Sequence, residues 1–133
     1  MRVRLRWIAV LLIAASAGLT AYYRDLLAAA LTANPIAATP ESIARGARLF
    51  RDNCAVCHGA GGRGDGPAAA NLGKRPKDLA RIAPPPIFPD GVVAYRIANG
   101  GDVMPAWKAV LSERDIWDLL NFIRSLAAGG AKT

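Results

Sequence analysis

The sequence is short of the side chains that bind metal ions or act as nucleophiles in enzymes. Its 133 residues contain one histidine, two cysteines and one methionine besides the initiator. A structural zinc site needs four ligands, which is more than the cysteines and the single histidine supply. The 17 Lys and Arg outnumber the 10 Asp and Glu, yet no basic stripe with interleaved aromatic residues occurs. We therefore expect neither a zinc site nor a nucleic-acid partner.

Charge is missing from a stretch near the N-terminus. The run Trp7–Tyr23 contains no charged residue and follows the basic start MRVRLR. A cleaved signal peptide and a retained transmembrane anchor both fit this pattern. We favour the anchor, because Trp7 and Tyr22 bracket the run as aromatic residues do at membrane interfaces, and cleavage after Ala17 would leave an apolar terminus. Both interpretations place the rest of the chain outside the cytoplasm, since the N-terminal arginines stay inside.

Sustained alternation of polar and apolar residues is also missing, which predicts an all-α fold. Thr39 followed by Pro40 is typical of a helix start, Asp90 is a candidate N-cap, and Ser112 with Asp115 forms a capping box. The three helices expected after these signals cover residues 40–52, 90–99 and 113–127.

The predicted organisation has four parts. They are an anchor or signal segment (residues 1–33), a short linker (34–39), a globular domain (40–128) and a tail (129–133). Within the domain, residues 59–89 are rich in Gly and Pro and give little sign of regular structure. A connection of that length suits a chain that wraps a large apolar cofactor.

Both cysteines and the histidine lie in the segment CAVCH, residues 54–58. A disulfide between Cys54 and Cys57, a thioredoxin-like redox site and covalent attachment of haem all use this spacing. The thioredoxin-like site needs a strand–helix–strand unit, of which the sequence gives no sign. In haem attachment, the two thiols add to the haem vinyl groups as thioethers, and the next residue, His58, becomes an iron ligand. We favour one covalent haem c, and the disulfide stays the alternative.

The segments CAVCHGAGGRGDGPAA, residues 54–69, and MPAW, residues 104–107, carry a family resemblance. The chain resembles the class I c-type cytochromes, the small monohaem electron carriers of bacterial periplasm and membranes. The resemblance covers roughly residues 40–128 and implies the small cytochrome c fold around one haem. It also implies that the last helix crosses the first one closely, with Gly46 and Phe50 against Leu119 and Phe122.

Met104 is the candidate for the second axial iron ligand. It is the sole internal methionine and precedes Pro105, which restricts it to an extended backbone, as suits a strap across a haem face. The alternative role is that of a core gap-filler. No second histidine exists, so bis-histidine ligation is excluded. Ligation by His58 and Met104 fills both axial positions and raises the reduction potential, which favours electron transfer over catalysis.

The resemblance implies supporting roles for two more residues. The carbonyl of Pro67 accepts the ring N–H of His58 and fixes its orientation, unless Pro67 is only a turn residue. Trp107 lies against the haem edge and donates its indole N–H to a propionate. A basic cluster in the long connection is a solvated face, a propionate contact or a docking site for an acidic partner. It comprises Lys74, Arg75, Lys77 and Arg81.

These observations predict an electron carrier rather than an enzyme. Its expected partners are redox proteins: a membrane oxidase, a dehydrogenase or a quinol-oxidising complex. The alternative function is a fixed haem c subunit of a larger membrane-bound oxidase or dehydrogenase, partly needed for assembly. The expected location is the bacterial cytoplasmic membrane with the haem domain facing the periplasm, or the soluble periplasm if the N-terminal segment is cleaved.

Overall fold

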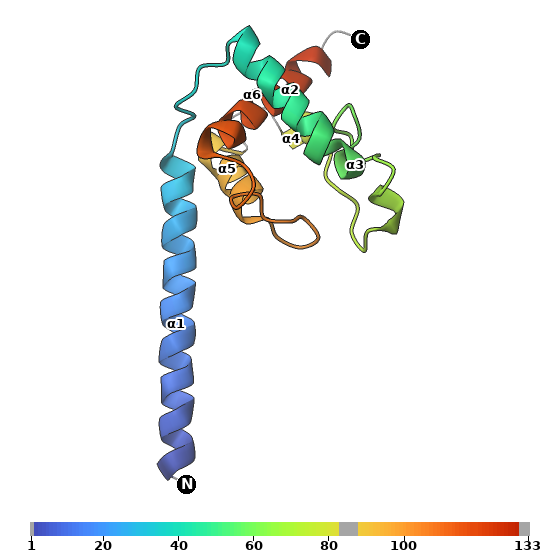
Figure 1. Ribbon diagram of the computed structural model, residues 1–133. Helices are drawn as coiled ribbons and strands as arrows, with labels where there is room; N and C mark the ends of the chain where they lie inside the picture. Colours follow the sequence, from blue (N-terminus) through green and yellow to red (C-terminus); the bar gives the residue numbers. More distant parts are fainter. Residues whose placement is uncertain (1, 83–87, 131–133) are drawn as a thin grey trace.

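The computed structural model describes residues 2–82 and 88–130, and in these the chain is helical (Figure 1). The elements are α1 (Arg2–Leu31), α2 (Pro40–Asn53), α3 (Ala55–His58), the 3₁₀ helix η1 (Ala69–Asn71), α4 (Leu79–Ile82), α5 (Asp90–Asn99) and α6 (Glu113–Gly130). The described ranges contain no strand, only an isolated β-bridge between Gly101 and Met104. The all-α expectation is confirmed. Helix α6 extends into the predicted tail, whose last three residues lie outside the described part.

Two of the three predicted helix starts are confirmed by their caps. The Thr39 side chain accepts a hydrogen bond from the Ser42 backbone N–H at 3.2 Å, and Pro40 is the first residue of α2. At the start of α6, the Ser112 backbone N–H donates to the Asp115 carboxylate at 3.0 Å. The Asp115 backbone N–H donates to the Ser112 hydroxyl in return, at 3.2 Å. Both ends satisfy backbone groups that lack partners within the helix.

The predicted cap of α5 is wrong by one residue. Pro89 occupies the N-cap position, and Asp90 is the first residue of the helix. The Asp90 carboxylate does not fold back onto the helix end, because it binds Arg124 of α6, with 3.0 Å between Nε and Oδ1. The Asp90 side chain, which the local pattern assigned to a helix cap, therefore forms an ion pair with another helix instead.

Helix α1 is apolar and stands away from the globular part over most of its length (Figure 1). Its segment Arg6–Leu31 is long and apolar enough to cross a membrane, and none of its most apolar window is buried in the protein. A signal sequence near an N-terminus can also be long and apolar enough to meet these criteria. Both interpretations of this segment therefore fit the fold.

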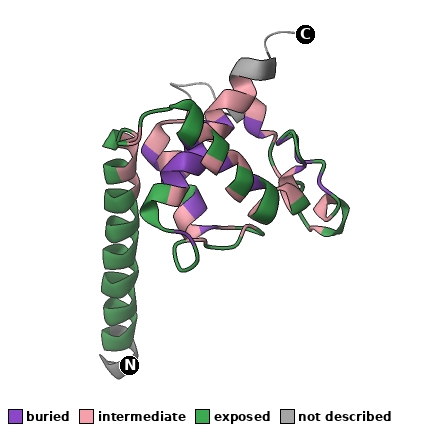
Figure 2. Cartoon of the chain, turned by 45° about the horizontal axis from the view of Figure 1, so that its top comes forward, coloured by how far each residue is buried: buried purple, intermediate pink, exposed green. Residues whose placement is uncertain are grey.

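The core lies where α2, α5 and α6 meet, and Figure 2 shows the buried residues gathered there. Helices α2 and α6 cross closely at Gly46, which is buried. The rings of Phe50 and Phe122 lie 5.1 Å apart across this crossing. The buried hydrophobic cluster consists of Phe50, Leu79, Ala94, Ile97, Leu111, Ile116, Trp117, Leu119, Leu120 and Ile123. The structure thus contains the crossing of terminal helices that the family resemblance implied.

A buried polar group fastens the same crossing. The Asp118 side chain is fully buried and accepts hydrogen bonds from the Ser42 hydroxyl and from Arg45, whose Nε lies 2.8 Å from Oδ2. Burial raises the pKa of Asp118, but the bonds from Arg45 and Ser42 outweigh it and leave the pKa below its ordinary value. The carboxylate is therefore charged and paired at neutral pH.

Candidate haem site

The attachment segment begins at a short break between two helices. Cys54 ends α2 and starts α3: its backbone N–H donates to the Phe50 carbonyl at 2.8 Å, and its own carbonyl accepts from the His58 N–H at 2.8 Å. Cys57 and His58 follow Cys54 by three and four residues. Because a helical turn has 3.6 residues, both lie on the same side of α3 as Cys54. Cys54 and Cys57 are free thiols. Burial, followed by the neighbouring Cys57, raises the pKa of Cys54 to about 11.

His58 is half-buried, and its Nδ1 atom is buried without a hydrogen-bond partner among the described residues. Burial lowers the pKa of His58, and a backbone hydrogen bond with Lys77 opposes that shift. The imidazole is therefore neutral at physiological pH, which is the form that binds metals. A buried polar atom without a partner is costly, so Nδ1 is expected to find an acceptor in the complete site, and the Pro67 carbonyl is the predicted one.

The glycine-rich segment after His58 folds back along α3. The backbone N–H groups of Gly64 and Gly66 donate to the carbonyls of His58 and Cys57, at 2.8 and 3.2 Å. Gly64 has a φ of 72°, and a Cβ on it would lie 2.1 Å from the Pro76 carbonyl oxygen. Only glycine permits this close approach, because any side chain would collide with the backbone. The segment GAGGRGDG thus brings residues 76 and 77 back toward the attachment turn.

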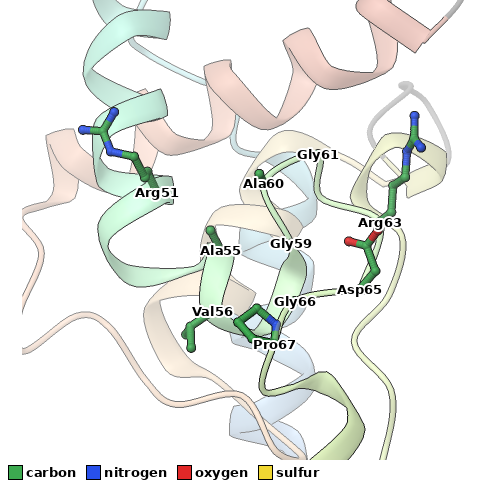
Figure 3. Close-up of a pocket in the computed structure, with 10 residues that line it drawn as sticks. All are labelled: Arg51, Ala55, Val56, Gly59, Ala60, Gly61, Arg63, Asp65, Gly66 and Pro67. Atoms are coloured by element: carbon green, nitrogen blue, oxygen red, sulfur yellow. The ribbon is translucent and has the colours of Figure 1, made fainter.

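Pro67 lies at the surface, on the wall of an open hollow outside α3 (Figure 3). The hollow is lined by Arg51, Ala55, Val56, Gly59, Ala60, Gly61, Arg63, Asp65, Gly66 and Pro67. None of the predicted iron ligands or attachment cysteines belongs to this lining. Since His58 Nδ1 has no partner in the structure, the bond to the Pro67 carbonyl stays a prediction.

Met104 is held in a tight loop between α5 and α6. Gly101 and Met104 exchange two backbone hydrogen bonds, both of 2.9 Å. Gly100 and Asp102 have φ values of 68° and 52°, and a Cβ on Gly100 would lie 2.5 Å from the Met104 carbonyl oxygen. The loop therefore has a defined shape. It leaves the Met104 side chain half-buried against the hydrophobic core.

Trp107 ties this loop to the C-terminal end of α5. Its backbone N–H lies 3.2 and 3.1 Å from the carbonyl oxygens of Ile97 and Ala98. Its half-buried side chain also packs against the core. These contacts place Trp107 beside the methionine loop, while its bond to a propionate stays a prediction.

Some predicted site residues that lie far apart in the sequence share contacts with the hydrophobic core. Cys54, Met104 and Trp107 all pack against one hydrophobic cluster. His58 approaches the same cluster through Phe50, with 6.5 Å between the ring centroids. Two free thiols, a neutral imidazole and a thioether at one apolar core fit a covalently bound haem. In the described part of the chain, no group of three His, Cys, Asp or Glu side chains is placed to hold a metal ion.

Two features of this region were not predicted from the sequence. Lys74 Nζ lies 3.0 Å and Arg96 Nη2 lies 3.2 Å from Oδ2 of Asp102, so the connection after the attachment segment is linked to the methionine loop. The sequence contains Asp102 in a glycine-rich turn but carries no signal that pairs it with Lys74. The other feature is the Lys77 backbone beside His58. The sequence carries no signal for this backbone contact, because every residue has a carbonyl group and the sequence does not show which one lies near His58.

Comparison with known proteins agrees with this geometry. The family model described as cytochrome C oxidase, cbb3-type, subunit III matches residues 41–123. The chain belongs to the class I c-type cytochromes. Cytochrome c6 of Limnospira maxima is 36% identical over 91 residues, which cover 66% of this chain and 97% of the relative. Cytochrome c6 of Euglena gracilis is 33% identical over 88 residues, covering 63% and 92%.

A solved structure shows the same fold in a larger assembly. The cytochrome matches a chain of the Kuenenia stuttgartiensis reducing HAO-like protein complex with a TM-score of 0.60 and 28% identity. The match covers 69% of this cytochrome but 46% of that chain. Membership of the family establishes haem-based electron transfer as the function, with one covalent haem c and the role of a carrier rather than an enzyme.

Proposed function

We propose that the cytochrome transfers electrons between redox proteins at the outer face of a bacterial cytoplasmic membrane, with Cys54 and Cys57 as the attachment residues and His58 and Met104 as the axial ligands. One observation carries the ligand assignment. Met104, from the loop after α5, and Cys54, from the end of α2, pack against the same core, which His58 approaches through Phe50.

The bound haem supplies one-electron redox chemistry, and the residues of the chain determine its surroundings. Burial keeps His58 neutral and able to bind iron. The paired hydrogen bonds between Gly101 and Met104 hold the backbone of Met104, from which its thioether would bind the iron. With His58 and Met104 both bound to the iron, the haem would have no position free for oxygen or peroxide. Pro67 and Trp107 are proposed to assist, through the His58 ring N–H and a propionate.

The membrane location rests on α1. Its exposed apolar surface and its bracketing aromatic residues, Trp7 and Tyr22, favour a retained anchor over a cleaved signal. The anchor would confine the cytochrome to partners that lie in, or dock on, the same membrane. These partners are a membrane oxidase, a dehydrogenase or a quinol-oxidising complex.

A second candidate function is that of a fixed subunit of a membrane redox complex. Two observations favour it: the matching family model is named for an oxidase subunit, and the structural neighbour belongs to a protein complex. Purification in mild detergent separates the two candidates. A constant stoichiometry with a second protein supports the fixed subunit, and a monomer supports the mobile carrier.

The deciding experiment is the intact mass of the protein isolated from its native membrane. The full chain plus one haem is expected. A haem-bearing chain that lacks about the first 17 residues would show cleavage at the small residues that end a signal segment. That result would contradict the retained anchor but not the haem or its electron transfer. A polypeptide mass without haem would contradict the whole proposal.

A carbon monoxide titration tests the ligand assignment separately. The reduced cytochrome is expected not to bind carbon monoxide at neutral pH, because Met104 occupies the position that the gas would take. Rapid stoichiometric binding would contradict the assignment of Met104.

A further inference from the structure

The last turns of α1 contact the globular domain, a contact that the predicted division into an anchor or signal segment, a linker and a domain does not include. The backbone N–H of Gly91 in α5 donates to the Thr32 carbonyl at 3.0 Å. A Cβ on Gly91 would lie only 2.0 Å from the Ala29 carbonyl oxygen. The carbonyl end of one helix thus meets the N–H end of another, where opposite partial charges attract and each satisfies groups that lack helical partners.

Burial along α1 changes at the same place. Residues 6–25 are exposed, whereas Leu26, Ala29 and Ala30 are half-buried. Figures 1 and 2 both show the C-terminal end of α1 beside α5, with the rest of the helix free of the domain. The contact between α1 and α5 therefore involves only the last two turns of α1, and the uncharged run Trp7–Tyr23 stays exposed and available to lipid.

The linker that follows is fastened to α6. The Asn34 side chain donates to Oδ1 of Asn121 at 2.8 Å and accepts from the Ile36 backbone N–H at 2.8 Å. Asn121 is buried, and its Nδ2 lies 3.1 Å from the Ile36 carbonyl oxygen and 2.8 Å from the Ser42 hydroxyl. Residues 34–39 were predicted to be a spacer, but these bonds give them a fixed path across the domain.

We propose that these two fastenings hold the haem domain at one fixed orientation on its anchor, so that partners must approach it in the plane of the membrane. The proposal rests on the proposed function for the retained anchor. A domain on a flexible tether samples many orientations and reaches partners at different heights. A docked domain presents its haem edge at one height above the membrane and at one angle, which suits an integral membrane partner. It excludes a carrier whose haem domain moves between partners on a flexible tether.

The test uses the full-length, haem-loaded cytochrome in oriented lipid bilayers. Electron paramagnetic resonance of the oxidised haem, recorded while the bilayers are rotated in the field, reports the spread of haem orientations. The wild type is expected to show one narrow orientation. Gly91→Leu is expected to broaden it with no change in the haem absorption spectrum, because the side chain separates α5 from α1. Gly73→Leu is the matched control, since a Cβ on Gly73 has no atom within 4 Å.

Limited proteolysis provides a readout that does not depend on haem. Thermolysin, which cuts beside apolar residues, is expected to cleave residues 34–39 slowly in the wild type and in Gly73→Leu. It is expected to cleave them several-fold faster in Gly91→Leu and Asn34→Ala, because local opening exposes the linker. Random haem orientation in the wild type, or equal cleavage of all four proteins, would overturn the proposal. Loss of haem or of the N-terminal segment, seen in the mass, would instead contradict the proposed function, and proteolysis would still test the fastening of the linker.

Discussion

The backbone oxygen of Asp118 lies 2.0 Å from the position that a Cβ atom on Gly46 would occupy. The Cβ atom of Phe122 lies 2.9 Å from the same position. Helices α2 and α6 therefore approach so closely that only glycine fits at their crossing. The crossing also holds Cys54 in place, because Cys54 follows the last residue of α2 directly.

Gly46→Leu is expected to destabilise the protein by about 1–3 kcal/mol or more, through overpacking against a backbone that cannot move aside. Thermal or urea unfolding of the haem-loaded protein measures the effect. Gly73→Leu is the matched control and should unfold like the wild type, because its side chain would point into open space. An unchanged melting temperature for Gly46→Leu would contradict the crossing.

The sequence predicted those parts of the fold that depend on local chemistry. Thr39 with Pro40 marked the start of α2 correctly, since an N-cap bond joins residues only three apart. The attachment segment was recognisable for the same reason, because the two cysteines and His58 lie within five residues. Contacts between distant residues carry no such signal.

Two features of the structure depend on distant contacts and were not predicted. The Asn34–Asn121 bond joins residues 87 positions apart, and the Lys74–Asp102 pair joins residues 28 apart. The residue type and sequence position of Asn34 or Lys74 do not indicate which distant residue is its partner. The short helices η1 and α4 were missed as well, because three or four residues are too few to show a helical period.

Removal of the proposed second ligand tests the site directly. Met104→Ala is expected to let the reduced protein bind carbon monoxide stoichiometrically and to lower its reduction potential, because the thioether favours ferrous iron. Val103→Ala is the control. The Val103 side chain is next to Met104 in the sequence but is exposed, so the haem spectrum and the reduction potential should stay unchanged. A Met104→Ala protein that excludes carbon monoxide as the wild type does would show that another group holds the position.

The buried carboxylate of Asp118 predicts how stability depends on pH. Its pKa is lower in the folded protein than the ordinary value of about 3.9 expected after unfolding. The unfolded chain therefore binds a proton that the folded chain does not, and the free energy of unfolding rises with pH through this range. The stabilisation is fully present above the unfolded pKa and is lost as the pH falls through the folded pKa.

Asp118→Asn is expected to flatten this acid dependence. Urea unfolding at a series of pH values from neutral to acidic measures it. Asp52→Asn is the matched control, because Asp52 is 62% exposed and pairs with the neighbouring Arg51 at the surface. Equal slopes for Asp118→Asn and the wild type would show that other carboxylates cause the acid dependence.

The pair of Lys74 and Asp102 predicts an effect of salt on the methionine loop. The hydrogen bond and charge of Lys74, followed by the charge of Arg96, lower the pKa of Asp102 and keep it ionised at neutral pH. The pair is exposed, with 3.0 Å between its charged atoms, so its attraction weakens as the screening length falls from about 10 Å at 0.1 M salt to about 3 Å at 1 M. Its contribution to holding Met104 should therefore be largest at low ionic strength.

Asp102→Asn removes the charge and keeps a residue that tolerates the φ of 52°. At low salt, reduced Asp102→Asn protein should take up carbon monoxide faster than the wild type, because the loop releases Met104 more often. Raising the salt concentration to about 1 M should reduce the difference, since the screening length then matches the separation of the wild-type pair. Asp52→Asn, which breaks an exposed pair away from the loop, should follow the wild type at both concentrations. A salt-independent difference would assign the effect to the turn itself, whereas no difference at low salt would show that the ion pair does not hold the loop.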